Sequence, residues 1–113
     1  MKLIDYDLNN LSFDKVAVTP SQRELLLTQI PNWEIIKKDS VEQLYGRFKC
    51  SDFVAAMDFA AAITLLTEQA DHHPTLIIEW GKVSVYWWSH YLKDLHINDF
   101  VMAAKTQKAY NSL

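Results

Sequence analysis

Cysteine, glycine, proline and clustered positive charge are scarce in this chain, and each scarcity excludes a class of protein. The single cysteine, Cys50, cannot form an internal disulfide, which is typical of proteins from a reducing compartment. Two glycines and three prolines in 113 residues exclude a collagen-like or low-complexity chain. The basic residues form no block and the net charge is −3, so we expect no nucleic-acid partner.

Long hydrophobic runs are also missing from the sequence. No apolar run approaches the roughly 20 residues that span a membrane. Asp5 and Asp7 interrupt the N-terminal region where a secretory signal needs a continuous apolar stretch. We therefore expect a cytoplasmic protein without a membrane partner. Hydrophobic residues still make up 50% of the chain, which is enough for the core of one domain.

The first part of the chain divides into an arm and a helix. Residues 1–18 show no firm periodicity and are expected to form a loosely attached N-terminal arm, followed by a single domain over residues 19–113. Thr19 and Gln22 have the spacing of a capping box, with a proline at the first helical position between them. This pattern predicts a helix that ends before Pro31.

Two β-hairpins and two further helices are expected after this helix. The predicted strands are 33–38, 41–48, 75–80 and 83–89, and the predicted helices begin near Ser51 and near His96. The order helix, two strands, helix, two strands, helix predicts an α+β two-layer domain, with three helices on one face of a four-stranded antiparallel sheet. For the last helix, either Asn98 is the cap, or His96 is the cap and Asp99 is the third helical residue.

The helix over residues 51–70 is apolar on nearly all of its faces. A helix on the surface of a domain needs only one apolar stripe, and a chain of this length has little material to cover a second one. We infer that the second face packs against another copy of the chain. The alternative is an alanine-rich helix that tolerates exposure to solvent.

Three of the four histidines can be brought together by the second hairpin. If Gly81 and Lys82 are the central residues of its turn, position 73 lies opposite position 90, and His72 is adjacent. Strand alternation places Trp88 on the face of His90, where it is either core or a wall for a flat heterocycle, whereas Trp87 is expected to face the core. Imidazole exchanges protons near neutral pH, so acid–base chemistry is favoured.

Other chemistries have weaker support. Three histidines can bind zinc, but no His-x-His or His-x-x-x-His spacing occurs and no glutamate adjoins the histidine pair, so no metal is expected. A histidine at a helix C-terminus can also be a mere partner of the helix dipole. Cys50 has no assigned base, and the chain has no glycine-rich phosphate loop and no G-x-S-x-G elbow. What remains is histidine acid–base catalysis on a small, flat, polar ligand.

Four ordered motifs resemble those of pterin-4a-carbinolamine dehydratases, most closely the bacterial branch. They are Asp71-His72-His73-Pro74, Glu79-Trp80-Gly81-Lys82-Val83, Trp87-Trp88-Ser89-His90 and Leu95-His96-Ile97-Asn98-Asp99-Phe100. The resemblance covers roughly residues 20–106. It implies dehydration of 4a-hydroxytetrahydropterin to quinonoid dihydropterin in pterin recycling after aromatic amino-acid hydroxylation. It implies no metal or organic cofactor, and a homodimer or homotetramer formed through the 51–70 helix and the sheet edge.

The resemblance also implies roles for individual residues. His72 and His90 would be the acid–base pair, and His73 would bind the pterin and orient its hydroxyl group. Pro74, Trp88, Ser89 and Asp99 would be substrate-binding residues, with Asp99 orienting a histidine. His96 is expected to be structural. Two other functions stay open: a protein-binding dimerisation module, as in animal relatives that assist a homeodomain transcription factor, and action on a pterin of molybdenum-cofactor metabolism.

Overall fold

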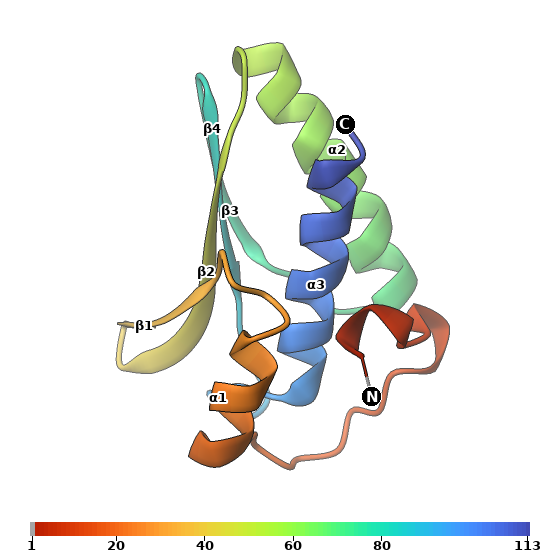
Figure 1. The fold of residues 1–113 in the computed structure, drawn as a ribbon, viewed down its shortest axis with the longest axis vertical. Coiled ribbons are helices and arrows are strands. Elements are labelled where there is room, and N and C mark those ends of the chain that lie inside the picture. Colours follow the sequence, from red (N-terminus) through yellow and green to blue (C-terminus); the bar gives the residue numbers. More distant parts are fainter. Residues whose placement is uncertain (1) are drawn as a thin grey trace.

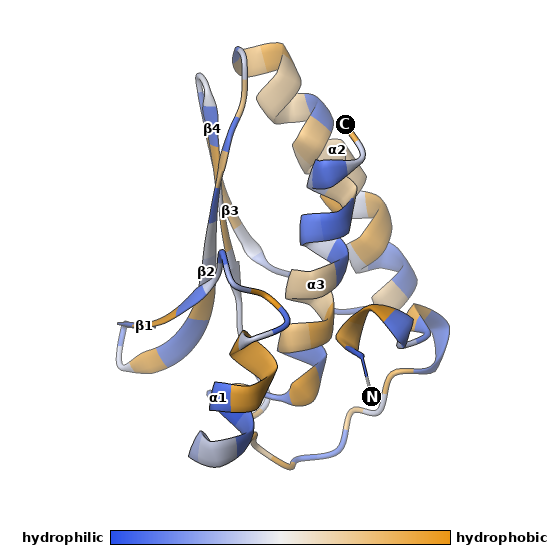
Figure 2. Cartoon of the chain, in the orientation of Figure 1, coloured by the Kyte–Doolittle hydropathy of each residue, from blue (hydrophilic) through white to orange (hydrophobic). Residues whose placement is uncertain are grey.

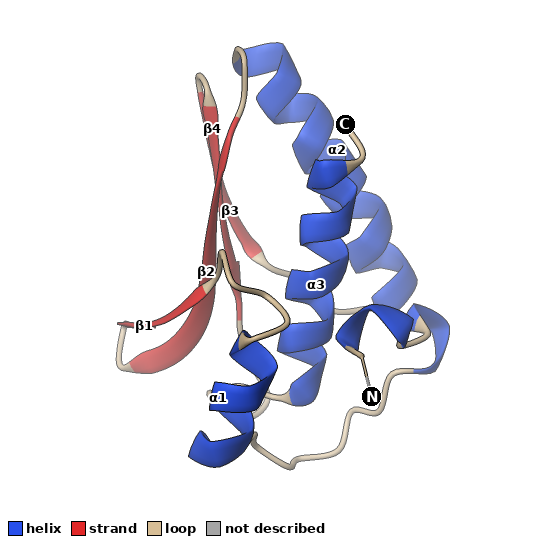
Figure 3. Ribbon diagram, in the orientation of Figure 1, coloured by secondary structure: helices blue, strands red, loops and turns tan. Residues whose placement is uncertain are grey.

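The structure is a computed structural model that describes residues 2–113. Within these residues it has one antiparallel sheet, in the strand order β1-β2-β4-β3, with the α-helices on a single face (Figure 1). This arrangement confirms the predicted α+β two-layer fold. The elements, distinguished by colour in Figure 3, are α1 (Pro20–Leu27), β1 (Glu34–Lys38), β2 (Val41–Lys49), α2 (Phe53–Ala70), β3 (Thr75–Glu79), β4 (Lys82–Trp87) and α3 (Ile97–Asn111).

The N-terminal arm is packed against the helices rather than loosely attached. It contains two short 3-10 helices, η1 (Leu3–Asp5) and η2 (Leu8–Asn10), and it crosses the helical layer before it reaches α1 (Figure 1). Leu3 and Leu8 are buried, and the Lys105 ammonium of α3 donates a hydrogen bond to the Ile4 carbonyl oxygen at 2.7 Å. Two isolated leucines produce no periodicity, which is why the sequence did not reveal this attachment.

Helices α1 and α3 begin at capping boxes. The Thr19 hydroxyl accepts a hydrogen bond from the Gln22 N–H, and the Gln22 side chain accepts one from the Thr19 N–H, as the sequence predicts. For α3 the second of the two predicted starts is correct. His96 is the cap residue, and the Asp99 carboxylate accepts a hydrogen bond from the His96 N–H at 2.8 Å. The start of α3 therefore directs the Asp99 side chain back toward the loop before the helix.

The turn of the second hairpin differs from the predicted one. Glu79 pairs with Lys82 and Thr75 pairs with Tyr86, so the central residues are Trp80 and Gly81 rather than Gly81 and Lys82. Gly81 has a φ of 81°, and a turn with a positive φ at its second central position requires glycine there. The register is consequently shifted by two residues, which preserves the face of every side chain but removes the predicted opposition of positions 73 and 90.

The hydrophobic core lies between the sheet and helices α2 and α3. Trp87 is fully buried there, and its indole N–H donates to the Thr106 hydroxyl at 3.3 Å, so its predicted core position is confirmed. The face of the sheet away from the helices carries Tyr45 stacked on Tyr86, with the Lys38 ammonium 4.4 Å above the Tyr86 ring. The other large core side chains include Leu44, Phe48, Phe59, Ile63, Phe100 and Met102.

Helix α2 has apolar residues on both its buried and its exposed sides. It is coloured orange or pale along most of its length in Figure 2, and Val54, Met57 and Leu65 are exposed large hydrophobic residues on it. By length and composition alone it could cross a membrane, with a mean hydropathy of 1.3, but core helices meet the same criteria. Its N-cap is Asp52, whose carboxylate accepts a hydrogen bond from the Ala55 N–H, and its C-cap is Asp71, directly before the histidine pair.

Replacing Gly46 by alanine should destabilise the fold. A Cβ at Gly46 of β2 would lie 2.8 Å from the indole ring of buried Trp33, so the ring would have to move. We expect a loss of about 1–3 kcal/mol of unfolding free energy, measured by chemical denaturation. Lys49→Ala, at an exposed position of the same strand, is the control. Equal stability of Gly46→Ala and wild type would contradict the close Trp33 contact.

Candidate active site

Three predicted site histidines surround one cavity of about 400 Å³ at the end of the molecule where α2 and β4 finish. Two of them, His72 and His73, come from the loop after α2, and His90 comes from the loop after β4. The predicted clustering is therefore present, although the turn used to derive it was misplaced. The lining residues are Phe13, Asp71, His72, His73, Pro74, His90 and Tyr91.

The end of α2 positions the histidine pair. Asp71 adopts a left-handed conformation with a φ of 52°, and this conformation turns the chain out of the helix. The His72 N–H then closes the last turn by donating to the Thr67 carbonyl oxygen at 3.3 Å. Pro74 follows directly and disfavours a helical conformation at His73, so the pair leads into β3.

His72 is the buried histidine of the cluster, with an exposed fraction of 6%. Its Nε2 lies 2.6 Å from Oδ1 of Asp99, and its ring stacks on Trp87 with centroids 5.5 Å apart. Asp99 Oδ2 accepts hydrogen bonds from the Ser89 hydroxyl and the His96 N–H, each at 2.8 Å. Because the carboxylate acts as the acceptor, we assign the proton of the neutral His72 ring to Nε2, which leaves the lone pair on Nδ1.

Ser89 and Asp99 therefore lie behind the cavity rather than on its surface. Both are fully buried, and neither lines the cavity. Their polar atoms are used to hold His72 and the start of α3, so in this structure they position a cavity residue. Of the four residues expected to bind substrate, Pro74 is the one that lines the cavity.

His73 is paired with a residue that sequence reasoning missed. Its Nε2 lies 2.7 Å from Oε2 of Glu68, which is on the last turn of α2. Both side chains are largely exposed, so the pair faces solvent at the cavity mouth. No glutamate adjoins the histidine pair in the sequence. A glutamate in the last turn of the preceding helix, five residues before His73, is the signal that indicates this partner.

His90 is oriented by stacking. Its ring lies parallel to that of Trp88, with centroids 3.9 Å apart and an angle of 14° between the planes. The loop is closed by hydrogen bonds from the Ser89 N–H to the Asp94 carbonyl oxygen and from the Lys93 N–H to the Ser89 carbonyl oxygen. Trp88 thus supports His90 and is not among the residues that line the cavity.

Two aromatic lining residues, Phe13 and Tyr91, were not predicted. The Phe13 ring makes an edge contact with His72, and the Tyr91 hydroxyl donates to the Asp14 carbonyl oxygen at 3.0 Å. Burial raises the pKa of Tyr91 above its ordinary value of 10.0, so its phenol stays neutral near neutral pH. Phe13 belongs to no local motif and reaches the cavity through contacts between distant segments, whereas Tyr91 directly follows His90 in the loop after β4.

Cys50 has the properties of an unreactive thiol. Burial, followed by the charge of Asp52, raises the pKa of Cys50 above its ordinary value of 9.0, so the nucleophilic thiolate is scarce at neutral pH. It lies outside the histidine cavity. In the part of the chain that the structure describes, no three His, Cys, Asp or Glu side chains are grouped closely enough to hold a metal ion.

The cavity thus combines three imidazoles with a buried carboxylate that orients one of them, on an α+β scaffold. Three imidazoles around one cavity can donate and accept protons near neutral pH. Comparison with known proteins identifies the family: residues 16–109 match the profile of the family described as "Pterin 4 alpha carbinolamine dehydratase". The chain belongs to this family, as its motifs predicted.

Individual relatives agree with the family match. A protein of Saccharophagus degradans named "Putative pterin-4-alpha-carbinolamine dehydratase" is 45% identical over 97 residues, which cover 86% of each chain. A protein of the same name from Nitrosococcus oceani is 50% identical over 80 residues, 71% of each chain. A crystal structure titled "transcriptional coactivator/pterin dehydratase" from Brucella melitensis has a TM-score of 0.76 at 28% identity, covering 84% of this chain and 99% of that one.

Asp99→Asn should change the tautomer of His72. The asparagine oxygen can still accept from Ser89 and His96, which leaves its NH₂ group facing His72 Nε2. The ring should then carry its proton on Nδ1, and this exchange is visible in the ¹⁵N chemical shifts of histidine-labelled protein. Asp58→Asn, an exposed change on α2, should leave the shifts unaltered. An unchanged His72 pattern in Asp99→Asn would contradict the assigned hydrogen bond.

Proposed function

We propose that this protein catalyses the dehydration of 4a-hydroxytetrahydropterin to quinonoid dihydropterin and water by histidine acid–base catalysis. The observation that carries the proposal is the cavity formed by His72, His73 and His90 in a chain that belongs to the carbinolamine dehydratase family. Its place would be the cytoplasmic recycling of pterin after aromatic amino-acid hydroxylation. The chemistry needs an acid, a base and a pocket for a flat ring, without an organic cofactor or a metal.

The reaction breaks the bond between C4a and its hydroxyl oxygen. A proton must be delivered to that oxygen so that it leaves as water, and a proton must be removed from a ring nitrogen so that the new double bond forms. One proton is consumed and one is released, so the enzyme returns to its starting charge when the two histidines exchange their protons through solvent. Each positioned group contributes roughly 10²–10⁴-fold to such a step.

The environment of each histidine suggests its role in the proposed reaction. His72 has its Nε2 proton held by Asp99, so Nδ1 is available as the base, and the carboxylate stabilises the imidazolium that forms, as in hydrolase triads. His90 is held by stacking on Trp88 and would supply the proton to the leaving hydroxyl. His73, tied to Glu68 at the cavity mouth, would bind and orient the pterin.

Substitution of His72 or His90 by alanine should lower the rate constant about 10²–10⁴-fold. The assay follows the loss of carbinolamine absorbance after protein is added to freshly generated 4a-hydroxytetrahydropterin. Because His72→Ala leaves an oxygen of buried Asp99 without a donor, thermal melting must show that this variant is folded. Trp80→Ala, at the exposed hairpin turn far from the cavity, is the control. No acceleration by wild type, or near-normal rates in both variants, would overturn the proposal.

We further propose that the chain forms a homodimer or homotetramer through α2 and a sheet edge. Val54, Met57, Ala61 and Leu65 recur at helical spacing on the exposed side of α2, opposite the buried stripe that includes Phe59 and Ile63. Strands β1 and β3 are the two edges of the sheet, with free backbone groups for pairing. The Brucella melitensis structure titled "transcriptional coactivator/pterin dehydratase" supports a second candidate function, in which the exposed side of α2 is a docking site for another protein.

Sedimentation of the wild type at micromolar concentration should show a species larger than a monomer, because burial of the exposed α2 stripe favours association. Leu65→Glu should shift this species toward the monomer, since it places a charge in the centre of the stripe. Leu25→Glu introduces the same charge at an exposed apolar position on α1, outside both α2 and the edge strands, and should leave the assembly intact. A monomeric wild type would refute the assembly.

A further inference from the structure

We propose that Phe13, on the N-terminal arm, is a substrate-binding residue that forms one wall of the pterin pocket. This inference rests on the proposed function and assigns a role to a segment that lies before the family match at residues 16–109. The N-terminal arm would then be part of the active site as well as the segment that precedes α1. The aromatic ring of Phe13 would contact the flat face or edge of the bound pterin.

The position of Phe13 suits this role. Its ring centroid lies 6.3 Å from that of His72 and 6.4 Å from that of Tyr91, with both rings inclined steeply to it. The side chain is still 45% exposed, and it lines the histidine cavity. An aromatic ring that is half exposed beside the proposed base contributes little to the core, but it offers an apolar surface to a ligand in the cavity.

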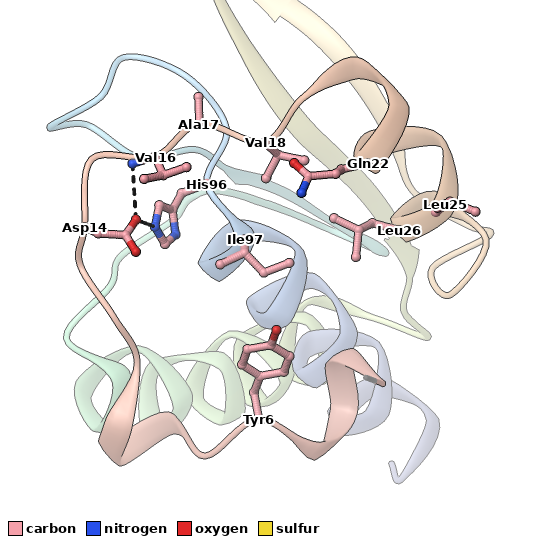
Figure 4. Close-up of a pocket in the computed structure, with 10 residues that line it drawn as sticks. All are labelled: Tyr6, Asp14, Val16, Ala17, Val18, Gln22, Leu25, Leu26, His96 and Ile97. Atoms are coloured by element: carbon pink, nitrogen blue, oxygen red, sulfur yellow. Dashed lines mark hydrogen bonds and ion pairs between the residues drawn. The ribbon is translucent and has the colours of Figure 1, made fainter.

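Polar contacts hold the backbone on both sides of Phe13. The Asn98 amide donates to the Ser12 carbonyl oxygen at 2.6 Å. The His96 Nε2–H donates to the Asp14 carboxylate at 2.8 Å, as Figure 4 shows. The donor assignment follows because His96 Nδ1 accepts from the Asn98 N–H. The bond from His96 lowers the pKa of Asp14 below its ordinary value of 3.8, so the carboxylate is ionised at neutral pH.

These anchors are unusual for a surface loop. His96 and Asn98 are almost completely buried, yet their side chains donate hydrogen bonds to an exposed segment. Water could satisfy the acceptors of that segment equally well. Apolar packing does not hold the segment by itself, since a second cavity of about 350 Å³ lies against Asp14, Val16 and His96 (Figure 4). Ordering a loop costs conformational entropy, so an anchored loop that presents an aromatic ring to a cavity is best explained by ligand contact.

Steady-state kinetics of Phe13→Ala tests the inference. We expect the KM for 4a-hydroxytetrahydropterin to rise about three- to tenfold, while kcat stays within about twofold, because a wall contact contributes to binding rather than to proton transfer. Phe13→Tyr should restore the wild-type KM. Val16→Ala, an exposed change on the same arm outside the histidine cavity, should have no effect. Thermal melting should be unchanged in all three variants.

The outcomes separate this inference from the proposed function. If the wild type does not accelerate dehydration, the proposed function fails and the inference fails with it. If the wild type is active but Phe13→Ala keeps its KM, or loses only kcat, the inference alone is overturned.

A second variant tests the anchors. Asp14→Ala removes the acceptor for His96 and should raise KM in the same direction as Phe13→Ala. The double variant should be no worse than Phe13→Ala alone, because the anchor acts through the ring. Independent, additive effects would contradict that coupling.

Discussion

The hydrogen bonds accepted by the buried Asp99 carboxylate are the interactions on which the rest of the site depends. The carboxylate accepts hydrogen bonds from the His72 imidazole, the Ser89 hydroxyl and the His96 N–H, which belong to the end of α2, the end of β4 and the start of α3. One group therefore fixes the relative positions of three separate chain segments. It lies in the first turn of α3, where the helix dipole favours a negative charge, so the helix itself stabilises the acceptor.

This arrangement explains why the histidine cluster exists although the predicted hairpin register does not. The sequence argument placed positions 73 and 90 opposite each other across β3 and β4. In the structure β3 begins after position 73 and β4 ends before position 90, so the histidines belong to the loops that follow α2 and β4. Loops do not hold side chains in place by backbone pairing. Instead, the buried Asp99 carboxylate holds the His72 ring by a hydrogen bond, and Trp88 holds the His90 ring by stacking.

Features that depend on residues close together in the sequence were predicted, whereas those that depend on residues far apart were not. The layers, the caps at Thr19 and His96 and the turn at Asp39-Ser40 follow from neighbouring residues, and local patterns predicted them. The turn at Trp80-Gly81 was misplaced because glycine serves at either central position, and only the strand register decides between them. The family resemblance implied Ser89 and Asp99 as substrate-binding residues, but their burial behind His72 depends on tertiary packing that no motif encodes.

Neither Glu68 nor Phe13 was predicted from the sequence, for two different reasons. Glu68 meets His73 across the end of α2, a contact that requires the exact residue at which the helix stops, and helix ends are the least predictable part of a local pattern. Phe13 contacts His72 although 58 residues separate them in the chain, and its anchors at the start of α3 look structural in the sequence. Long-range contacts of this kind leave no periodicity, so a structure is needed to find them.

The site divides into a buried half and an open half, and the proposed chemistry gives a reason for both. His72, Ser89 and Asp99 are buried and joined by hydrogen bonds, so the tautomer of His72, the proposed base, is set before substrate arrives. The side chains of Phe13 and His73 are partly exposed and lie on the open side of the cavity. A pterin must enter and leave, and contacts on this side can rearrange without disturbing the proton position at His72. Separation of the two halves lets one cavity combine a preorganised base with an accessible binding surface.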